Sequence, residues 1–407
     1  MAGYKKLMIL GGSRYILPVI EAAHELGCYV ITADYLPDNV AHRFSDEYCN
    51  VSIIDKDAVL ERAKELAIDG IMSFAADPGV VTAAYVAEQM SLPFQGSYEA
   101  VDTLQNKAKF RQFLLDHQFN CPRYIKVGSP DEALEKLKDL SFPLIVKPVD
   151  SAGSKGVTKL EMQQQIGEAV QNALAFSRSG ECIIEEFIAQ DGYSSDSDGF
   201  SIDGVFRCVS FTDQLFDKEC DNPYAPSAYV MPSTMPVEKQ EELVAELNRL
   251  ARLLDLRTGI YNIETRVGIN GKAYIMEVSP RGGGNRLAEM LRYATSIDLV
   301  KASVCAALGF RVDEFAPMEF ESVWYQGILH SLHGGRFMGV SLPDKVASEN
   351  LEEIQSWIRP DSRVEGFSAA NHAFGTIFLH YPDRDSLDGV DEMLRNSICI
   401  ENGQEDA

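Results

Sequence analysis

GIYNIETRVGINGKAYIMEVSPRGGGNR, residues 259–286, is the stretch that decides how we expect this chain to fold. Asn270-Gly271 is a dipeptide favoured by tight two-residue hairpin turns, because both central residues need positive φ. If this turn closes a hairpin, Ile269 pairs with Lys272, and the rest of the register follows by counting outward.

This register gives the hairpin an apolar face and a polar face. The expected apolar pairs are Val267 with Tyr274, Thr265 with Met276, and Ile263 with Val278. On the polar face, Glu264 lies opposite Glu277 and Asn262 lies opposite Ser279. Two carboxylates directly across a ladder repel each other. A cation between them removes the repulsion, and Mg²⁺ suits the role because it takes one or two carboxylates plus water and phosphate oxygens.

Cationic and flexible residues follow the second strand directly. Arg281 precedes a run of three glycines, and Arg286 ends the stretch. These residues supply two fixed cations and a backbone that a ligand can approach closely. Either glutamate alone is better explained as part of a solvated sheet face. The facing pair followed by arginines favours a metal–phosphate site.

The composition indicates an ordinary globular protein with an acidic surface. The chain has 407 residues, 45% hydrophobic and 24% charged, with a formal net charge of -24. This length allows two or three domains with full cores. The charge excludes nucleic acid and anionic membranes as expected partners, so a polyphosphate must be held by a local group of cations and amides.

The cysteines form no recognisable framework. There are 8, scattered, with no C-x-x-C pair and no close grouping with histidine, so neither a disulfide scaffold nor a zinc site is expected. His330 and His333 are close in sequence, but without a third ligand in spacing the core or surface interpretation is preferred. The start of the chain has too short an apolar run for a signal peptide, and no run is long enough to span a membrane. We expect a cytoplasmic protein.

Residues 1–100 predict an α/β domain with a parallel, Rossmann-like sheet, because strand and helix signals alternate. The expected strands are Leu7–Leu10, Tyr29–Ala33 and Gly70–Phe74, and the expected helices are Ile16–Leu26, Lys56–Leu66 and Val80–Met90. The turn at residues 11–13 could hold an anion at a helix N-terminus, although glycines there often only permit a tight turn. Asp34 would lie at the crevice edge, where a helix cap or a solvated carboxylate explains it equally well.

Residues 101–310 predict a second, α+β domain. Thr103–His117 reads as a basic helix, and Pro130–Leu140 as another. The buried strand at residues 142–148 contains Lys147, and lysine is rarely buried without a partner. The small-residue loop 150–157 could present amides to phosphate or could be a plain hairpin turn.

The remaining elements of this region are read as follows. Ile183–Ile188 is a strand, 190–200 a polar loop, 212–235 irregular, and Lys239–Leu254 and Leu287–Leu308 helices. Residues 311–407 predict a small mixed C-terminal domain, with strands near 324–330 and 375–380. The tail after residue 400 is expected to be frayed.

Taken together, these motifs resemble the ATP-grasp superfamily, in particular its carbamoyl-phosphate synthase, biotin carboxylase and phosphoribosylglycinamide synthetase branch. The resemblance covers roughly residues 1–310. Each motif is short and weak alone, but their order and spacing are specific. The matching motifs are Asn106-Lys107, residues 146–148, the loop 151–156, residues 185–188, residues 262–266 and residues 277–281. The resemblance implies a preceding α/β domain and two lobes that hold ATP between them.

The resemblance also implies roles for individual residues. Lys107 and Lys147 would contact ATP phosphates, under a lid that includes Ser151, Gly153, Ser154 and Gly156. The adenine slot would be lined by Glu185, Glu186, Phe187 and Ile188. Glu264 and Glu277 would hold Mg²⁺, with Mn²⁺ as an alternative, and Ser279 is the third candidate ligand. Arg281, with Lys147 and Arg286, would stabilise the transferring phosphoryl group.

Two positions depart from the family pattern. Ser279 stands where the family usually has Asn, so the second metal ligand is a weaker hydroxyl or is supplied differently. The family's ribose-binding Glu has no clear match, because residues 190–200 hold Asp191, Asp196 and Asp198 instead. Ribose contact is therefore unassigned.

The reaction implied is ligation of a small-molecule carboxylate, activated as an acyl phosphate, to an amine or ammonia, with ADP and phosphate released. Such phosphoryl transfer relies on positioning and electrostatics and needs no nucleophilic side chain. Two alternatives stay open: a bicarbonate-using carboxylase or carbamoyl-phosphate-type enzyme, and a nucleotide-binding regulatory protein without turnover. The sequence names neither substrate, and a homodimer is left open.

Overall fold

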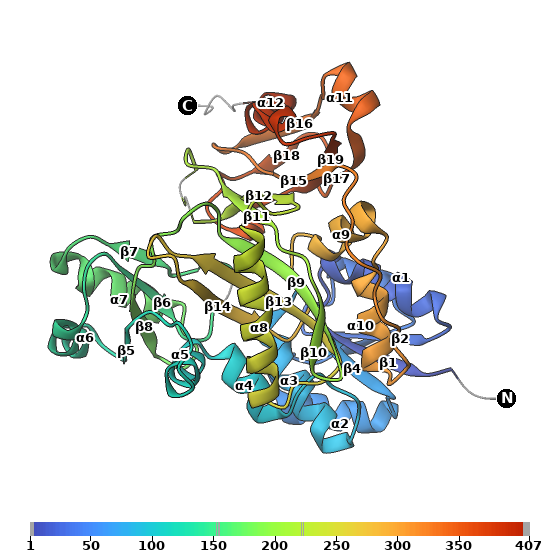
Figure 1. Ribbon diagram of the computed structural model, residues 1–407. Coiled ribbons are helices and arrows are strands. Elements are labelled where there is room, and N and C mark those ends of the chain that lie inside the picture. Colours follow the sequence, from blue (N-terminus) through green and yellow to red (C-terminus); the bar gives the residue numbers. More distant parts are fainter. Residues whose placement is uncertain (1–3, 152, 154, 221, 223, 402–407) are drawn as a thin grey trace, which may run out of the picture.

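The computed structural model describes residues 4–151, 153, 155–220, 222 and 224–401. Figure 1 shows an N-terminal α/β region in blue, a central pair of sheets, and a C-terminal region in orange and red at the top of the view. This is the fold class that the sequence predicts: a parallel α/β domain, then antiparallel sheets with helices.

The N-terminal sheet is parallel throughout, with strand order β3-β2-β1-β4. Its strands are β1 (Lys6–Leu10), β2 (Tyr29–Asp34), β3 (Glu47–Asn50) and β4 (Gly70–Ser73). Its helices are α1 (Leu17–Glu25), α2 (Lys56–Leu66) and α3 (Asp77–Met90). The alternation of signals predicted this arrangement, except for β3, a short strand at the sheet edge.

The helix expected at Thr103–His117 is in fact two helices. α4 (Tyr98–Gln105) ends at Asn106, whose extended backbone starts α5 (Lys107–Asp116). The Asn106 side chain accepts hydrogen bonds from the amides of Ala108 and Lys109, both at 3.1 Å, and so caps α5. The chain changes direction at this cap, and Lys107, the first residue of α5, contacts Ser151 and Glu277.

Two antiparallel sheets form the centre of the molecule (Figure 1). The smaller sheet has the order β5-β8-β6-β7 and packs against α6 (Pro130–Lys136) and α7 (Ile166–Ala175). Its strands are β5 (Tyr124–Val127), β6 (Leu144–Pro148), β7 (Thr158–Leu160) and β8 (Cys182–Glu186).

The larger sheet, of order β10-β9-β13-β14, carries the stretch that opened the sequence analysis. Its strands are β9 (Ser195–Ile202), β10 (Val205–Val209), β13 (Gly259–Val267) and β14 (Ala273–Ser279). Helix α8 (Val237–Leu253) packs across it, and Leu243 and Leu247 join Ile263 and Val278 in one buried cluster. The expected polar loop at 190–200 was wrong from residue 195 onward, because β9 pairs with β13 over residues 195–201 and buries its serines and Asp198.

A third sheet joins the central and C-terminal regions, in the order β11-β12-β15-β19-β17. Its strands are β11 (Asp213–Phe216), β12 (Pro226–Met231), β15 (Val323–Leu329), β17 (Leu351–Ser356) and β19 (Gly375–Tyr381). Residues 212–235, expected to be irregular, therefore supply two strands. β15 and β19 match the expected C-terminal strands, and β12 pairs directly with β15.

The C-terminal region is completed by a small sheet of order β18-β16-β20 and two helices. These are β16 (Gly335–Val340), β18 (Ser362–Val364), β20 (Ile398–Glu401), α11 (Asp344–Glu349) and α12 (Val390–Ser397). The helix expected at Leu287–Leu308 is interrupted at Ser296, which has a φ of 63°, giving α9 (Leu287–Thr295) and α10 (Leu299–Ala307). α10 packs on α1, and one apolar cluster runs from Leu7 through Leu291 to Phe378.

Within the described part of the chain, no helix combines the length and hydrophobicity needed to cross a membrane.

Candidate active site

The hairpin brings Glu264 opposite Glu277 and Asn262 opposite Ser279, as the sequence predicts. The turn, however, has three residues, 269–271, closed by a hydrogen bond of 2.9 Å from the Gly268 amide to the Lys272 carbonyl. Gly271 takes the positive φ, 73°, that such loops need.

The predicted pairs nearer the turn were therefore wrong: Thr265 pairs with Ile275 and not with Met276. Met276 forms a bulge, which restores the original count before the glutamates are reached. The extra loop residue and the bulge cancel each other, so the carboxylates still face one another.

Strand β9 adds two further carboxylates to the same polar face. Asp196 pairs with Glu264, and Asp198 pairs with Asn262. Because cross-strand partners share a face, Asp196, Glu264 and Glu277 form a row across three strands. Asn262 donates to Asp196 at 2.7 Å, and the Gly283 amide donates to Asp198 at 2.7 Å.

The environment of Asp196 and Asp198 disfavours the ionised form of both carboxyl groups. Burial raises the pKa of Asp196 to about 7, and the carboxylates of Asp198 and Glu264 act in the same direction. Burial likewise raises the pKa of Asp198 to about 6. Asp198 is fully buried, and its second carboxylate oxygen has no hydrogen-bond partner among the described residues. Such a face gains stability from an added cation.

Two lysines lie beside this row of carboxylates. The Nζ atom of Lys107, at the start of α5, lies 3.1 Å from Glu277 Oε2 and donates to the Ser151 carbonyl at 3.1 Å. Burial alone would lower the pKa of Lys107, but Glu277 outweighs burial and raises it, with help from Asp77 and Glu264. Lys107 is therefore a permanent cation at the base of the β6–β7 connection.

Lys147, on β6, has the buried partner that its position requires. It forms an ion pair with Glu185 of β8, whose other oxygen accepts from Arg111 Nε at 2.9 Å. Burial would raise the pKa of Glu185, but Arg111 and Lys147 outweigh it and hold the pKa at about 2. Burial lowers the pKa of Lys147, and the nearby cations Arg111 and Lys107 act with it against Glu185. The three cations Arg111, Lys147 and Lys107 thus have only the carboxylates of Glu185 and Glu277 as ion-pair partners among the described residues. This excess of positive charge favours a bound phosphate.

Arg281 and Ser279 are engaged by the N-terminal region. Arg281 makes a bidentate ion pair with Asp77 of α3, with distances of 2.9 and 2.7 Å. The Ser279 hydroxyl donates to Asp77 at 3.0 Å and accepts from Gln105. Asp77, in the first turn of α3, therefore binds both Arg281, which the resemblance assigns to the phosphoryl group, and Ser279, which it assigns to the metal.

Arg286 faces the C-terminal region. Its guanidinium donates to Glu289 at 2.6 Å, to Glu353 of β17 at 2.6 Å, and to Thr376 of β19 at 3.1 Å. Burial would lower the pKa of Arg286, but these carboxylates raise it. These contacts give Arg286 a part in joining α9 to the third sheet. Its catalytic assignment remains a prediction.

The expected adenine and lid segments lie on the smaller sheet. Glu185 and Glu186 end β8, and the Ile188 carbonyl accepts from Arg266 at 3.1 Å. The Phe187 amide donates to the Pro143 carbonyl at 3.0 Å. The lid segment connects β6 to β7. Gly153 and Gly156 have φ of 70° and 68°, whereas Ser154 lies outside the described residues.

A cavity of about 280 Å³ opens at the meeting of these elements. Its lining combines α3, α4 and α5 with the start of the β6–β7 connection and β14, through residues that include Asp77, Gln105, Lys107, Ser151 and Glu277. The cavity therefore joins the N-terminal region to the row of carboxylates. A small substrate bound in this cavity would touch both the N-terminal region and Glu277, at the end of the row of carboxylates.

Sequence reasoning missed Asp77 and Gln105, and it counted Arg111 only as one of the basic residues of a helix. Arg111 could have been found, because it lies four residues after Lys107 on one helix and so shares its face. Asp196 and Asp198 were noticed but placed in a loop. Asp77 and Gln105 carry no local signal, since their role depends on tertiary contacts with β14.

Residues 140–289 match the family described as the ATP-grasp domain. The carbamoyl phosphate synthase large chain of Thermoanaerobacter sp. (strain X514) is 27% identical over 220 residues, which are 54% of this chain and 20% of that protein. This chain thus covers about a fifth of the length of that relative.

Two solved structures share the fold over almost the whole chain. The L-amino acid ligase from Bacillus licheniformis has a TM-score of 0.81 and 20% identity, covering 99% of this chain and 100% of that chain. The phosphoribosylglycinamide synthetase from Anaerococcus prevotii has a TM-score of 0.77 and 20% identity, covering 98% and 100%. Residues 140–289 of this chain therefore match an ATP-grasp domain, and the whole chain has the fold of these two solved structures.

Proposed function

We propose that this protein activates a small carboxylic acid as an acyl phosphate at the expense of ATP and joins it to an amine or ammonia, releasing ADP and phosphate. The observation that carries the proposal is the facing pair Glu264 and Glu277, with the partly buried cations Lys107 and Lys147 nearby. Glu277 and Lys107 also line the cavity of about 280 Å³.

The residues present fit a magnesium–nucleotide complex. The donors on the polar face are carboxylate oxygens, from Asp196, Glu264 and Glu277, with the Ser279 hydroxyl next to them. Hard oxygen ligands suit Mg²⁺ or Mn²⁺ and not a thiophilic metal. Asp198 is buried, and one of its oxygens has no hydrogen-bond partner in the described part of the chain, so it adds negative charge that a cation would offset. When bound, Mg²⁺–ATP supplies the γ-phosphoryl group and neutralises its charge.

The chain's own residues would position the reactants and spread the negative charge. Lys107 and Lys147 would hold phosphate oxygens, because both are partly buried cations within reach of the β6–β7 connection. Arg281, oriented by its bidentate contact with Asp77, would face the group in transfer. The cavity against α3 would hold the acid or the amine, so its lining would set the choice of substrate.

The test is a screen for ADP release. The full-length protein is incubated with Mg²⁺–ATP and a panel of amino acids and small organic acids, each paired with ammonium or with a second amino acid. We expect ADP and phosphate in equal amounts, with a condensation product identified by its mass. Incubation with the acid alone should exchange oxygens within ATP, which reports a reversible acyl phosphate.

The other outcomes separate the alternatives. Turnover that requires bicarbonate would identify the carboxylase or carbamoyl-phosphate type, and AMP as product would overturn the proposal. Tight ATP binding without turnover on any acid would favour the regulatory protein. Lys147→Met serves as the inactive variant, and Lys138→Met, at an exposed position, is the matched control that should retain full activity.

A further inference from the structure

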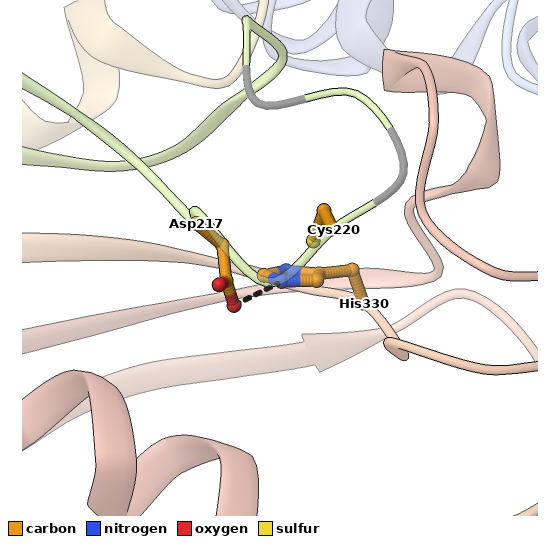
Figure 2. A group of neighbouring side chains, drawn as sticks. All are labelled: Asp217, Cys220 and His330. Atoms are coloured by element: carbon orange, nitrogen blue, oxygen red, sulfur yellow. Dashed lines mark hydrogen bonds and ion pairs between the residues drawn. The ribbon is translucent and has the colours of Figure 1, made fainter.

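Three potential metal ligands meet away from the ATP-grasp cleft, where the third sheet joins the central region. Asp217 and Cys220 come from the turn that follows β11, and His330 comes directly after β15 (Figure 2). Their ligand atoms all lie within 4.8 Å of one another. Cys220 is 7% exposed and His330 is 9% exposed, so the group is largely shielded from solvent.

The imidazole of His330 is held in one orientation. Its Nδ1 atom lies 2.7 Å from the Ile328 carbonyl, and a carbonyl can only accept, so Nδ1 carries the hydrogen. The ring also packs on Phe367, with ring centroids 4.3 Å apart. Metal-binding histidines are oriented in this way, through a hydrogen bond from the nitrogen that does not bind the metal.

This orientation directs the other nitrogen, Nε2, at a carboxylate. Nε2 lies 3.3 Å from Asp217 Oδ2. A neutral imidazole would present a lone pair there, and the carboxylate oxygen is also an acceptor. Two acceptors at this separation need either a proton or a metal ion between them. A proton makes a simple ion pair of these two residues, whereas a metal ion at this place would also lie within reach of the thiol of Cys220, the third member of the group.

The separation fits a metal site. Tetrahedral zinc has bonds of about 2.0–2.2 Å to nitrogen and oxygen, so adjacent ligand atoms lie roughly 3.3–3.5 Å apart. The observed 3.3 Å between Nε2 and Oδ2 lies in that range. A thiolate ligand lies slightly farther away, because its bond to zinc is about 2.3 Å.

We propose that Asp217, Cys220 and His330 bind a Zn²⁺-class divalent cation at a site separate from the magnesium–nucleotide site. One sulfur, one nitrogen and one oxygen ligand suit Zn²⁺, whereas Mg²⁺ prefers oxygen alone. Asp217 and His330 also line a cavity of about 240 Å³, which has room for a water as the fourth ligand. The bound ion would fasten the turn after β11 to the end of β15.

The sequence could not reveal this site by local spacing. His330 and Asp217 are 113 residues apart, and only the pairing of β12 with β15 brings their segments together. The expectation that the chain has no zinc site rested on near neighbours in sequence. The three ligands instead lie on two distant segments joined by the third sheet.

The test uses Co²⁺ as a visible probe and Zn²⁺ as the competitor. The full-length protein is treated with chelator, desalted and titrated with Co²⁺. We expect one equivalent to bind with a thiolate-to-cobalt charge-transfer absorption, and one equivalent of Zn²⁺ to abolish that absorption. Changes around a metal site cost about 10–100-fold in affinity, so loss of a ligand in Cys220→Ser or His330→Gln should cost at least about 100-fold.

Matched variants exclude binding elsewhere. Cys399→Ser changes an exposed cysteine and His333→Gln an exposed histidine, and both should keep the absorption. Wild-type protein that shows no charge-transfer band and retains no Zn²⁺ after desalting would overturn the proposal and leave a His330–Asp217 ion pair. The wild-type titration requires no variant, so a misfolded variant cannot obscure the answer. ADP release plays no part, so failure here is distinct from failure of the proposed function.

Discussion

Glu277 lies between a carboxylate and an ammonium group, since Glu264 faces it across the hairpin and Lys107 lies 3.1 Å away. Glu277→Gln removes the charge but keeps the shape. We expect turnover to be abolished and Mg²⁺-dependent ATP binding to weaken, with little change in thermal stability. The measurements are ADP release, and calorimetric titration of ATP at several Mg²⁺ concentrations.

Glu238→Gln is the control for this variant, because Glu238 is exposed in the first turn of α8. It should behave as wild type. Unaltered Mg²⁺ dependence of ATP binding in Glu277→Gln would remove Glu277 from the metal site.

Asp198 illustrates how a residue of the candidate site can reduce stability. Its folded-state pKa of about 6 lies above the unfolded value of about 3.9. The ionised form is therefore disfavoured in the folded protein, and the penalty is absent below about pH 4, grows up to about pH 6, and is complete above. Asp198→Asn should raise the free energy of unfolding by roughly 3 kcal/mol at pH 8 without metal, and by little at pH 4.

Thermal unfolding of Asp198→Asn at the two pH values, in chelator, checks this prediction. Asp203→Asn is the control, because Asp203 is exposed in the turn between β9 and β10, where its φ of 50° also suits asparagine. A gain in stability of equal size at both pH values would contradict the assigned cause.

At the scale of elements, the connection between β6 and β7 is the part we expect to respond to nucleotide. Lys107 contacts its first residues through the Val149 and Ser151 carbonyls, and Lys155 is exposed farther along. Phosphate bound at Lys107 would hold this connection in place. Tryptic cleavage after Lys155 should therefore slow when ATP and Mg²⁺ are added.

Mass spectrometry of the fragments follows that cleavage. Cleavage after the exposed Lys345, in α11, serves as the internal control and should not change. If both sites are cut at the same rates with and without saturating nucleotide, the connection is a structural hairpin and not a lid.

At the scale of the whole molecule, one ion pair joins the N-terminal region to the hairpin. Arg281 and Asp77 make a bidentate contact, with side chains 9% and 17% exposed. Either residue changed to Ala leaves the other largely buried without its partner, so each change alone should destabilise by about 3 kcal/mol. The two changes together should cost less than their sum, and the coupling should be on the order of 1 kcal/mol or more.

Denaturant unfolding of the two single variants and the double variant measures the coupling. Arg281→Ala should also lose on the order of 10³-fold in turnover while ATP affinity changes far less, because arginine acts on the group in transfer. Strictly additive destabilisation would show that the two side chains are not coupled in solution.

The fold was predictable where one segment decides its own structure. Strand–helix alternation predicted the parallel sheet. Counting from Asn270-Gly271 predicted the facing glutamates, but only because the bulge at Met276 cancels the extra residue of the turn. Prediction from the sequence failed where contacts between distant segments determine the local structure. β9 was read as a loop because its serines and aspartates are polar, yet they are buried by pairing with β13. Asp77 became part of the candidate site only through α3 meeting β14.

The third sheet has a consequence for anyone who divides this chain into modules. β12 belongs by sequence to the central region, yet its hydrogen-bonding edge is covered by β15, from beyond residue 310. A fragment ending at 310 would expose that edge as an open template for strand addition between molecules. Such a fragment should precipitate or form polymers, and chimaeras with relatives will work best when β11, β12, β15, β17 and β19 are exchanged as one piece.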